Sequence, residues 1–462
     1  MRRIAPVLLL TTLLMASTAA WAVRESYIHL VISDRAQISQ LTNVISITNV
    51  VGNDVYAVAT DPMLAELTAL GYSYNTLPSL KKDAVIKMAK SASEVKKSWQ
   101  AYPTYEQYVE ILQGFAAQYP NICRLQEIGL TQQGRTQYVL KITDNPDVAE
   151  DEPEVFFTAT MHGDEPLGFM LMLRLADQIL SGYGTDPRLT ALVNNEELWI
   201  NPLSNPDGTY AGGNDTIKYA TRTLANGLDF NRNFPTRLAG EHPDGNPFAP
   251  ETVAMMNFAT LHHFTLSASF HSGNEVLNYP WDESADRHPD DAFFIALSRA
   301  YATQAQLDGP KQYMTQLDNG ITNGWDWFEV NGGRQDYMTA FQGDREVTIE
   351  LSIKYMVNAT EVERYWVANN NAMLGYMEAA LTGVRGIVTN AAGEPLAATV
   401  EVVGIPDVGV KVSSDPWVGN YHRMLVPGVY TVRIAAPGYQ TAESTLTVNA
   451  GPATRWDVVL LP

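Results

Sequence analysis

Two histidines and one glutamate stand where buried strands are expected to end. The apolar run at 156–160 leads into His162, and Glu165 follows three residues later. A second apolar run at 265–270 leads directly into His271. Two imidazoles and one carboxylate form a donor set that binds zinc and leaves one coordination position for water. The pattern predicts a catalytic site with one Zn2+ ion on His162, Glu165 and His271.

The short His162–Glu165 pair has a second interpretation. Acidic residues favour the first turn of a helix, and an apolar helix is expected from Pro166 to Leu180. Asp164, the neighbour of Glu165, is expected to point away from the ion. The distant histidine at the end of another strand favours the zinc site over a simple helix start.

Residues 346–352, EVTIELS, alternate polar and apolar side chains. Inside a covered sheet, the polar face of such a strand must face a cavity or a site. Glu350 is therefore predicted to take a proton from a zinc-bound water. An exposed edge strand, whose polar face meets solvent, is the other interpretation.

Four further polar residues lie close together in the segment RTLANGLDFNRNFP. Asn231 and Arg232 are neighbours, and a guanidinium beside an amide recognises a carboxylate through charge-assisted hydrogen bonds. Arg222 could stabilise a developing oxyanion. Asp229 could orient a ligand imidazole from behind.

The elements around these residues predict an α/β domain over residues 101–382. Helical patterns there alternate with apolar strands at 154–160, 197–203, 265–270 and 346–352. This order predicts a mixed, largely parallel sheet with helices on both faces. In such sheets ligands bind beyond the carboxyl ends of the strands, where the candidate residues stand.

Two smaller domains are expected on either side. Residues 23–80 follow a β-α-β-β-α-β order, which predicts a small α/β domain. Residues 81–100 carry six lysines and are predicted to be an exposed linker open to proteolysis, with a solvated helix face as the other interpretation. Residues 383–462 show short alternating strands with Gly, Pro and Asn turns, which predicts a β-sandwich.

Composition limits the classes of function. The chain has 462 residues and a net charge of −20, which disfavours binding to nucleic acid or to anionic membranes. Residues 1–22 have two arginines, a short apolar stretch and Ala20-Trp21-Ala22, which predict a signal peptide and a secreted or periplasmic protein. The apolar stretch is too short to span a bilayer, so no stable membrane insertion is expected. Cys123 is the single cysteine and cannot pair within the chain.

The motifs resemble those of the zinc metallocarboxypeptidase family. They are H-x-x-E at 162–165, N-P-D-G at 205–208, G-x-D-x-N-R-N-F-P at 227–235, H-S-G at 271–273, G-G-x-Q-D at 332–336 and E-V-T-I-E-L-S at 346–352. The resemblance covers about 100–382 and is closest to the regulatory branch, that of carboxypeptidases D, E, M and N. That branch also carries a C-terminal transthyretin-like β-sandwich, which residues 383–462 resemble.

The resemblance implies hydrolysis of the last peptide bond of a peptide or protein. His162, Glu165 and His271 resemble the zinc ligands of the family. Glu350 resembles its catalytic glutamate, which promotes attack by zinc-bound water. Asp229 resembles the partner of the first ligand histidine.

The resemblance also assigns the substrate side of the site. Asn231 and Arg232 resemble the pair that binds the terminal carboxylate of the substrate. Arg222 resembles the arginine that polarises the scissile carbonyl.

The segment 315–335 matches the family in part. Phe328 stands where the family usually has a substrate-capping tyrosine, so the hydroxyl is missing. Gln335 matches the regulatory branch and is expected to contact substrate. The aspartate that selects C-terminal Lys or Arg is expected before the GITNG motif, where Thr315 is found instead.

Two other functions use the same features. A zinc amidase that acts on cell-wall peptides would share the scaffold and also meet substrates that end in carboxylates. A non-catalytic binding or adhesion protein would use the cleft and the sandwich, but it has no need of Glu350. Other carboxypeptidases have an α/β propeptide that covers the active site, and 23–80 is expected to act likewise.

Overall fold

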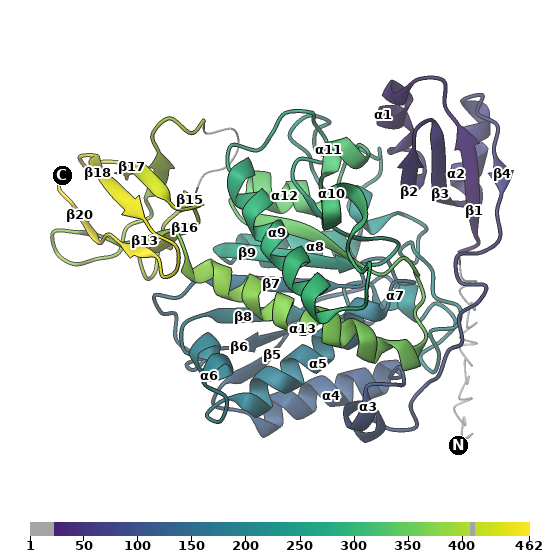
Figure 1. The fold of residues 1–462 in the computed structure, drawn as a ribbon, viewed down its shortest axis with the longest axis horizontal. Coiled ribbons are helices and arrows are strands. Elements are labelled where there is room, and N and C mark those ends of the chain that lie inside the picture. The colour runs from purple at the N-terminus through teal and green to yellow at the C-terminus, as the bar shows by residue number, and fades with distance from the viewer. Residues whose placement is uncertain (1–22, 407–411) are drawn as a thin grey trace, which may run out of the picture.

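The computed structural model of the chain describes residues 23–406 and 412–462, so the predicted signal peptide 1–22 lies outside the described residues. Figure 1 shows a large central α/β part with a smaller part on either side of it. The N-terminal α/β domain lies beside the central part near α11 (Gly324–Trp327), and the C-terminal β-sandwich lies at the opposite side.

The central sheet has eight strands in the order β11-β10-β12-β9-β7-β8-β6-β5. The inner strands β12, β9, β7 and β8 run parallel, whereas β5, β6 and the β10–β12 pair are antiparallel. The predicted mixed, largely parallel sheet is confirmed. The strands are β5 (Cys123–Leu130), β6 (Thr136–Ile142), β7 (Glu154–Ala159), β8 (Glu197–Asn201), β9 (Phe264–His271), β10 (Glu275–Tyr279), β11 (Ile321–Asn323) and β12 (Arg345–Leu351).

Helices cover both faces of this sheet. Phe156 and Phe157 are neighbours on β7 and point to opposite faces, because side chains alternate along a strand. Phe157 packs into a core with α4 (Tyr105–Gln118), α5 (Leu167–Gly182), α9 (Asp291–Asp308) and α13 (Val362–Glu378). Phe156 packs into a second core with α8 (Pro250–Thr260) and α12 (Arg334–Phe341). Both faces are therefore buried, as continuous apolar strands require.

The N-terminal domain is a four-stranded antiparallel sheet, and its two α-helices lie in the sequence between the strands. Its strands lie in the order β2-β3-β1-β4, so β2 forms an edge. Its elements are β1 (Glu25–Val31), α1 (Ile38–Leu41), β2 (Ser46–Val51), β3 (Asp54–Thr60), α2 (Asp61–Ala69) and β4 (Asn75–Thr76). Its core continues into the central domain through Trp327, Phe328 and Val330.

The lysine-rich segment is not an exposed linker over its whole length. Residues 92–98 form helix α3, and Val95 and Trp99 are buried in the core that contains α4. Lys96 pairs with Asp177 through a 2.9 Å contact between Nζ and Oδ1. The apolar positions between the lysines explain this packing, since one face of the short helix is apolar. The most exposed part of the connection is confined to about 82–87.

The C-terminal part consists of two small sheets that enclose a core of their own. One holds β16 (Asn420–Arg423), β13 (Val384–Asn390), β19 (Thr454–Arg455) and β20 (Val458–Leu460), and the other β15 (Val412–Ser413), β14 (Thr399–Val402), β17 (Gly428–Ala435) and β18 (Ala442–Val448). Asp290 joins this sandwich to the central domain, because its two oxygens accept from Arg345 at 2.5 Å and from Arg423 at 2.6 Å.

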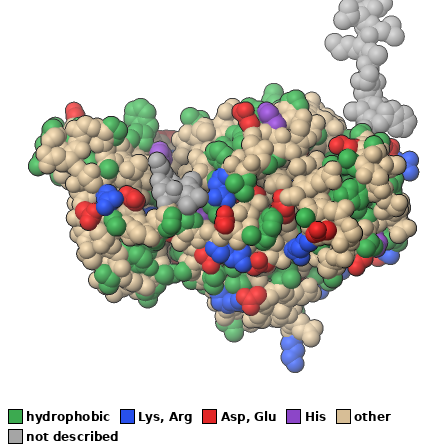
Figure 2. Space-filling model, turned by 90° about the horizontal axis from the view of Figure 1, so that it is seen from above, with side chains coloured by type: hydrophobic (Ala, Val, Ile, Leu, Met, Phe, Trp, Pro, Cys, Tyr) green, Lys and Arg blue, Asp and Glu red, His purple; other side chains and the backbone are tan. Residues whose placement is uncertain are grey.

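The surface shows no single-sign region on the face drawn in Figure 2, where acidic and basic side chains lie interspersed. Within 23–406 and 412–462, none of the helices has the length and apolar character that crossing a membrane requires.

Candidate active site

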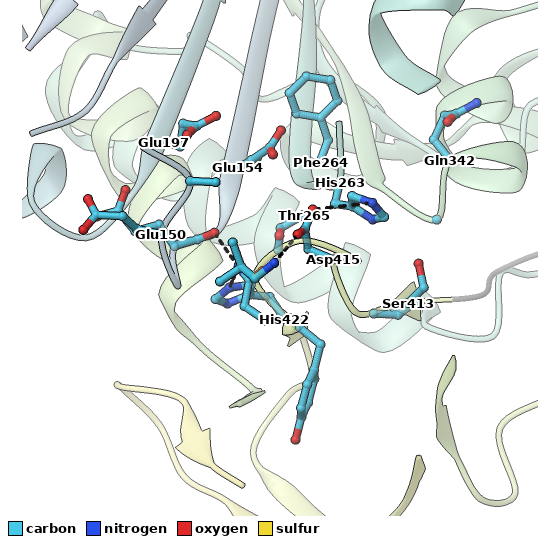
Figure 3. A pocket seen from close by; sticks show the side chains of 17 residues that line it. Glu150, Glu154, Glu197, His263, Phe264, Thr265, Gln342, Ser413, Asp415 and His422 are labelled. Atoms are coloured by element: carbon cyan, nitrogen blue, oxygen red, sulfur yellow. Dashed lines mark hydrogen bonds and ion pairs between the residues drawn. The ribbon is translucent and has the colours of Figure 1, made fainter. Parts of the chain in front are cut away.

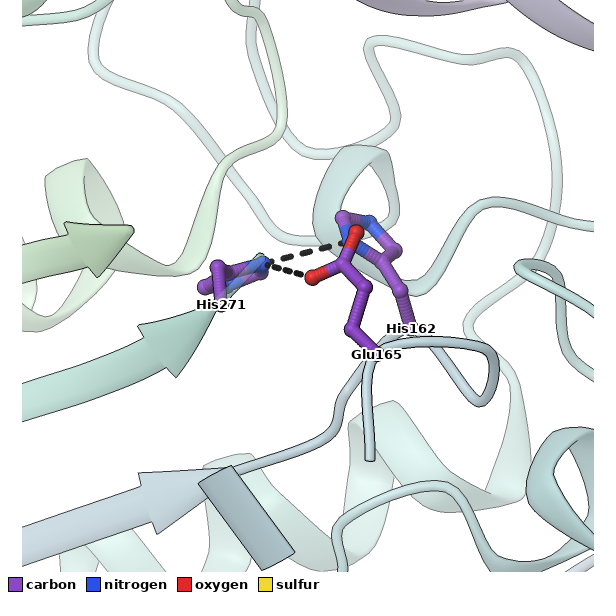
Figure 4. Close-up of side chains that lie close together, drawn as sticks. All are labelled: His162, Glu165 and His271. Atoms are coloured by element: carbon purple, nitrogen blue, oxygen red, sulfur yellow. Dashed lines mark hydrogen bonds and ion pairs between the residues drawn. The ribbon is translucent and has the colours of Figure 1, made fainter. Parts of the chain in front are cut away.

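The three predicted metal ligands meet at the carboxyl ends of β7 and β9. His162 follows β7, Glu165 precedes α5, and His271 is the last residue of β9. Figure 4 shows their side chains pointing toward one another. Nδ1 of His162 lies 2.9 Å from Glu165 Oε1, Nδ1 of His271 lies 3.0 Å from Glu165 Oε2, and the two Nδ1 atoms are 3.2 Å apart. All three residues are buried.

The other ring nitrogens fix how the two imidazoles are oriented. Nε2 of His162 donates to Asp229 Oδ1 at 3.1 Å, and Nε2 of His271 lies 3.1 Å from Ser269 Oγ. With a proton on each Nε2, both Nδ1 atoms present lone pairs to the same point. Two lone pairs and a carboxylate at this separation fit a divalent cation, and a His2Glu set fits Zn2+.

Asp164 does not join this cluster. Its Oδ2 atom lies 3.3 Å from Nζ of Lys81, at the start of the connecting segment. The expectation that Asp164 points away from the ligand atoms therefore agrees with its position.

Glu350 lies next to His271, because the two residues are paired in register between β12 and β9. β12 is an inner strand with β10 on its other side, so the alternative of an exposed edge strand is wrong. Burial, followed by the charge of Glu165, raises the pKa of Glu350 to about 8. Within the described part of the chain, its Oε2 atom has no hydrogen-bond partner. The carboxyl group is thus available for proton transfer in the pocket.

Arg222 and Asp229 each contact one of the candidate ligands. Nη1 of Arg222 donates to Glu165 Oε1 at 2.7 Å. Burial alone would raise the pKa of Asp229, but the interaction with His162 and the positive charges of Arg232 and Arg222 hold it well below its usual range. Asp229 therefore stays ionised, which suits its contact with the imidazole of His162.

Asn231 and Arg232 line the same pocket. Nη2 of Arg232 donates at 3.1 Å to the backbone carbonyl of Ile47, which belongs to β2 of the N-terminal domain. Nε of Arg232 is buried and finds no acceptor among the residues described. The guanidinium therefore has donors to offer to an oxygen-bearing ligand.

Asp282, an acidic residue that was not predicted from the sequence, also lines the pocket. Asp282 is buried, and its Oδ1 atom accepts from Asn278 Nδ2 at 2.9 Å and from Gln335 Nε2 at 3.1 Å. Burial raises the pKa of Asp282 to about 7, although Asn278 and the charge of Arg232 oppose the shift. Gly324 makes room for it, since a Cβ atom there would lie 1.7 Å from the same oxygen.

Thr315 is not part of this pocket. It is exposed, and its hydroxyl donates to the carbonyl of Gln312 at 2.9 Å. The residue near the position where the family has its selecting aspartate therefore does not line the pocket. The signal that could have found Asp282 is its position three residues after the end of β10 at Tyr279.

Two aromatic residues complete the lining. Phe328 packs against Trp327, with ring centroids 4.9 Å apart, and carries no hydroxyl into the pocket. Tyr355, in the loop after β12, also lines the pocket and was not singled out from the sequence. Ile47 and Thr48 of the N-terminal domain lie in the lining as well.

A second group of acids lies elsewhere, between the central domain and the sandwich. Figure 3 shows this groove, with Glu150, Glu154, Glu197 and His422 on its walls. It differs from the candidate metal centre, because Nζ of Lys141 already pairs with Glu197 at 2.6 Å.

The sequence profile described as Zinc carboxypeptidase matches residues 108–372, which is more than half of the chain. The chain belongs to the zinc carboxypeptidase family. Members of this family use one Zn2+ ion, in agreement with the donor set described above. A second profile, described as Carboxypeptidase regulatory-like domain, matches residues 383–461.

Several curated carboxypeptidases are similar in sequence. Carboxypeptidase D of Mus musculus is 35% identical over 367 residues, which cover 76% of this chain and 26% of that protein. Carboxypeptidase SOL1 of Arabidopsis thaliana is 34% identical, with 78% and 72% covered. The catalytic chain of carboxypeptidase N of Homo sapiens is 32% identical, with 76% and 83% covered. The chain thus spans about a quarter of the length of its carboxypeptidase D relatives.

Solved structures support the fold of the zinc carboxypeptidases. Carboxypeptidase A from Helicoverpa armigera has a TM-score of 0.58 and 18% identity, covering 77% of this chain and 97% of that chain. Thrombin activatable fibrinolysis inhibitor has a TM-score of 0.56 and 17% identity, covering 77% and 98%.

Proposed function

We propose that this chain is a carboxypeptidase that removes a C-terminal Lys or Arg from peptides or proteins. One observation carries the proposal: a pocket beside the candidate zinc ligands and Glu350 contains both Arg232 and Asp282. A C-terminal basic residue has a carboxylate for the arginine and a cation for the aspartate. Opposite charges at two points fix both the end of the chain and the identity of its last residue.

In this proposal His162, Glu165 and His271 hold one Zn2+ ion. The bound ion would supply Lewis acidity to a water molecule and to the scissile carbonyl. Glu350 takes a proton from the attacking water and passes it to the leaving amine. Arg222 faces the carbonyl oxygen and stabilises the negative charge that develops there.

The other residues select and hold the substrate. Asn231 and Arg232 bind the terminal carboxylate. Gln335 contributes indirectly, because its amide holds the carboxyl group of Asp282 at 3.1 Å. Phe328 covers the last side chain without a hydrogen bond of its own.

We also propose that residues 23–80 keep the enzyme latent. Three residues of this domain support the idea, because each forms a hydrogen bond with a residue predicted above to belong to the site. Ser46 Oγ contacts both Arg222 and Asp229, the carbonyl of Ile47 accepts from Arg232, and the carboxylate of Glu25 accepts from the backbone nitrogens of residues 222 and 223. A peptide cannot reach the arginines while this domain stays in place.

The test is hydrolysis by the zinc-loaded chain of peptides that differ only in the last residue. The chain is assayed intact and after cleavage at a protease site engineered at 82–87, the most exposed part of the connection. Lys and Arg peptides are expected to be cleaved best, and peptides with an amidated C-terminus are expected to resist. Preferential cleavage of cell-wall stem peptides would favour the amidase, and no turnover in any condition would contradict an enzymatic role.

Export is part of the same proposal. It is supported by the arginines, the apolar stretch and the Ala20-Trp21-Ala22 segment within residues 1–22. N-terminal sequencing of the mature protein is expected to begin at Val23, in the periplasm or the medium.

A further inference from the structure

Phe328 stands where the family usually has a tyrosine, so the pocket lacks the hydrogen-bond donor that the tyrosine hydroxyl would supply. A ring without a hydroxyl can cover a substrate, but it cannot donate to a peptide oxygen. Among the described residues that line the pocket there is one phenol, that of Tyr355, together with Phe328, Arg222 and Glu350. Tyr355 comes from a different element, the loop that follows β12.

Tyr355 is placed at the end of the pocket where the peptide bond would be broken. Its ring lies against Gly273, which follows the candidate ligand His271 by two residues, and Arg222 and Glu350 line the same pocket. Tyr355 therefore belongs to the end that holds the candidate ligands and the general base.

The backbone opposite Tyr355 is shaped to admit it. Gly273, two residues after His271, has φ of +132°, which L side chains rarely adopt. A Cβ atom on Gly273 would lie 2.8 Å from both Cζ and the hydroxyl oxygen of Tyr355. The glycine of the H-S-G motif thus lets the phenol lie directly against the strand end that carries His271.

The loop that carries Tyr355 is anchored on both sides. Ser352 Oγ accepts from the backbone nitrogen of Lys354 at 3.0 Å, and Tyr102 donates at 2.6 Å to the carbonyl of Val357. These contacts fix the backbone around residue 355. A group held in this way loses little conformational freedom when it binds a substrate.

The hydroxyl of Tyr355 is protonated and faces the N-terminal domain. Burial raises its pKa, and the charges of Glu165 and Glu350 add to the shift while Arg222 opposes it. Thr48, on β2 of the N-terminal domain, lines the same pocket as Tyr355. When the N-terminal domain moves away, this donor becomes available to a peptide.

We propose that the Tyr355 hydroxyl donates a hydrogen bond to the substrate next to the scissile bond and replaces the hydroxyl that position 328 lacks. The proposal rests on the carboxypeptidase function proposed above. Arg222 and Tyr355 then act on the same side of the peptide, one through its charge and the other through a neutral donor. The donor acts most strongly where negative charge develops, so its main effect falls on kcat.

The test compares four forms of the whole zinc-loaded chain, cut and uncut at 82–87: wild type, Y355F, F328Y and the double variant. Y355F is expected to lower kcat/KM by about 10- to 100-fold, mostly through kcat, which corresponds to loss of a hydrogen bond to a charged group. F328Y in the Y355F background is expected to recover much of the loss, because it returns a phenol to the pocket. Zinc content and the unfolding midpoint are expected to stay unchanged.

Tyr376→Phe is the matched control. Tyr376 is also a buried tyrosine, but its hydroxyl donates at 2.7 Å to the carbonyl of Ser267 and it does not line the pocket. This variant is expected to lose stability and keep its kcat/KM. Equal kcat/KM for Y355F and wild type would overturn the role of Tyr355 and leave the carboxypeptidase proposal standing.

A binding measurement separates the two proposals further. Calorimetry with a peptide ending in Lys is done in the E350Q background, with and without Y355F. Binding that is weakened by Y355F supports the contact even if wild type shows no turnover. Binding that is unchanged, together with an unchanged kcat/KM, overturns it.

Discussion

Two carboxyl groups of the pocket have raised pKa values, and their neighbours differ. Glu350 lies among the candidate ligands, where burial and the charge of Glu165 raise its pKa to about 8. Asp282 lies beside Asn278 and Gln335, where burial raises its pKa to about 7. Perturbed carboxyl groups that converge on one pocket are typical of catalytic sites.

Replacing Glu350 with glutamine tests its role as the general base. Glutamine keeps the shape of the side chain but cannot accept a proton, so kcat is expected to fall by about a thousandfold. Zinc content, measured by atomic absorption, is expected to stay at one ion per chain, because the three ligands are untouched. Turnover that persists in this variant would show that another group serves as the base.

The second residue-scale prediction is a pH dependence of selectivity. Because its pKa is raised to about 7, Asp282 is neutral below that pH and negative above it. The ratio of kcat/KM for a Lys-terminated peptide to that for a Leu-terminated one is therefore expected to rise as pH increases through about 7. The ratio cancels effects that Glu350 or the metal ligands have on both peptides. Asp282→Asn is expected to give a low ratio that stays flat with pH, and a flat profile in the wild type would contradict the role of Asp282.

The residues at the ends of the strands could be predicted from the sequence. The residues that reach the pocket from the loops could not. His162 and His271 follow from apolar runs that end in polar residues, since parallel strands place their ends at one edge of the sheet. Glu350 follows from the polar face of an alternating strand. Asp282 and Tyr355 lie in irregular loops after β10 and β12, where no periodicity shows which way a side chain points. The missing Cβ atoms of Gly324 and Gly273 leave room for these two side chains.

Helix α3 differs from its prediction in another way. Its lysines indicated an exposed segment, whereas one side of the helix is buried. Composition dominated that interpretation, although Val95 and Trp99 supply an apolar face. Long charged side chains at the edge of a buried face keep their charges near solvent or near a partner such as Asp177.

The element-scale prediction tests whether α3 belongs to the central core. Val95→Ala is expected to lower the free energy of unfolding by about 2 kcal/mol, since it opens a cavity beside α4. Lys97→Ala, at an exposed position of the same helix, is expected to change it by less than about 0.5 kcal/mol. Urea titrations of both variants with equal m-values make the comparison. Equal and small effects would mean that α3 does not contribute to the core.

At the scale of the whole molecule, the N-terminal domain and the active site share one buried surface. Asn49 accepts from Trp327 Nε1 at 3.0 Å, and Arg35 donates to the carbonyl of Trp327 at 2.6 Å. The sequence predicted a domain of this kind, but a surface between two domains has no periodic pattern and could not be located in advance. These contacts lie beside Phe328 and thus beside the substrate pocket.

The whole-molecule prediction is activation by a single cut. Cleavage at the engineered site in 82–87, with release of residues 23–81, is expected to raise kcat/KM by more than about tenfold. A closed state favoured by only about 1.4 kcal/mol already hides nine-tenths of the molecules. Size-exclusion chromatography reports release, and the same cut made in the E350Q variant is the control. Full activity before the cut would contradict latency.

Strand β2 lies at the edge of its sheet, and in the intact chain the carbonyl of Ile47 on this edge is paired with Arg232. Once the N-terminal domain has departed, that edge would present unpaired backbone groups, which invite strand pairing with other chains or degradation. Self-association of the freed fragment would compete with its return to the enzyme. Activation would then be irreversible, because the freed domain would be lost to self-association or degradation before it could bind the enzyme again.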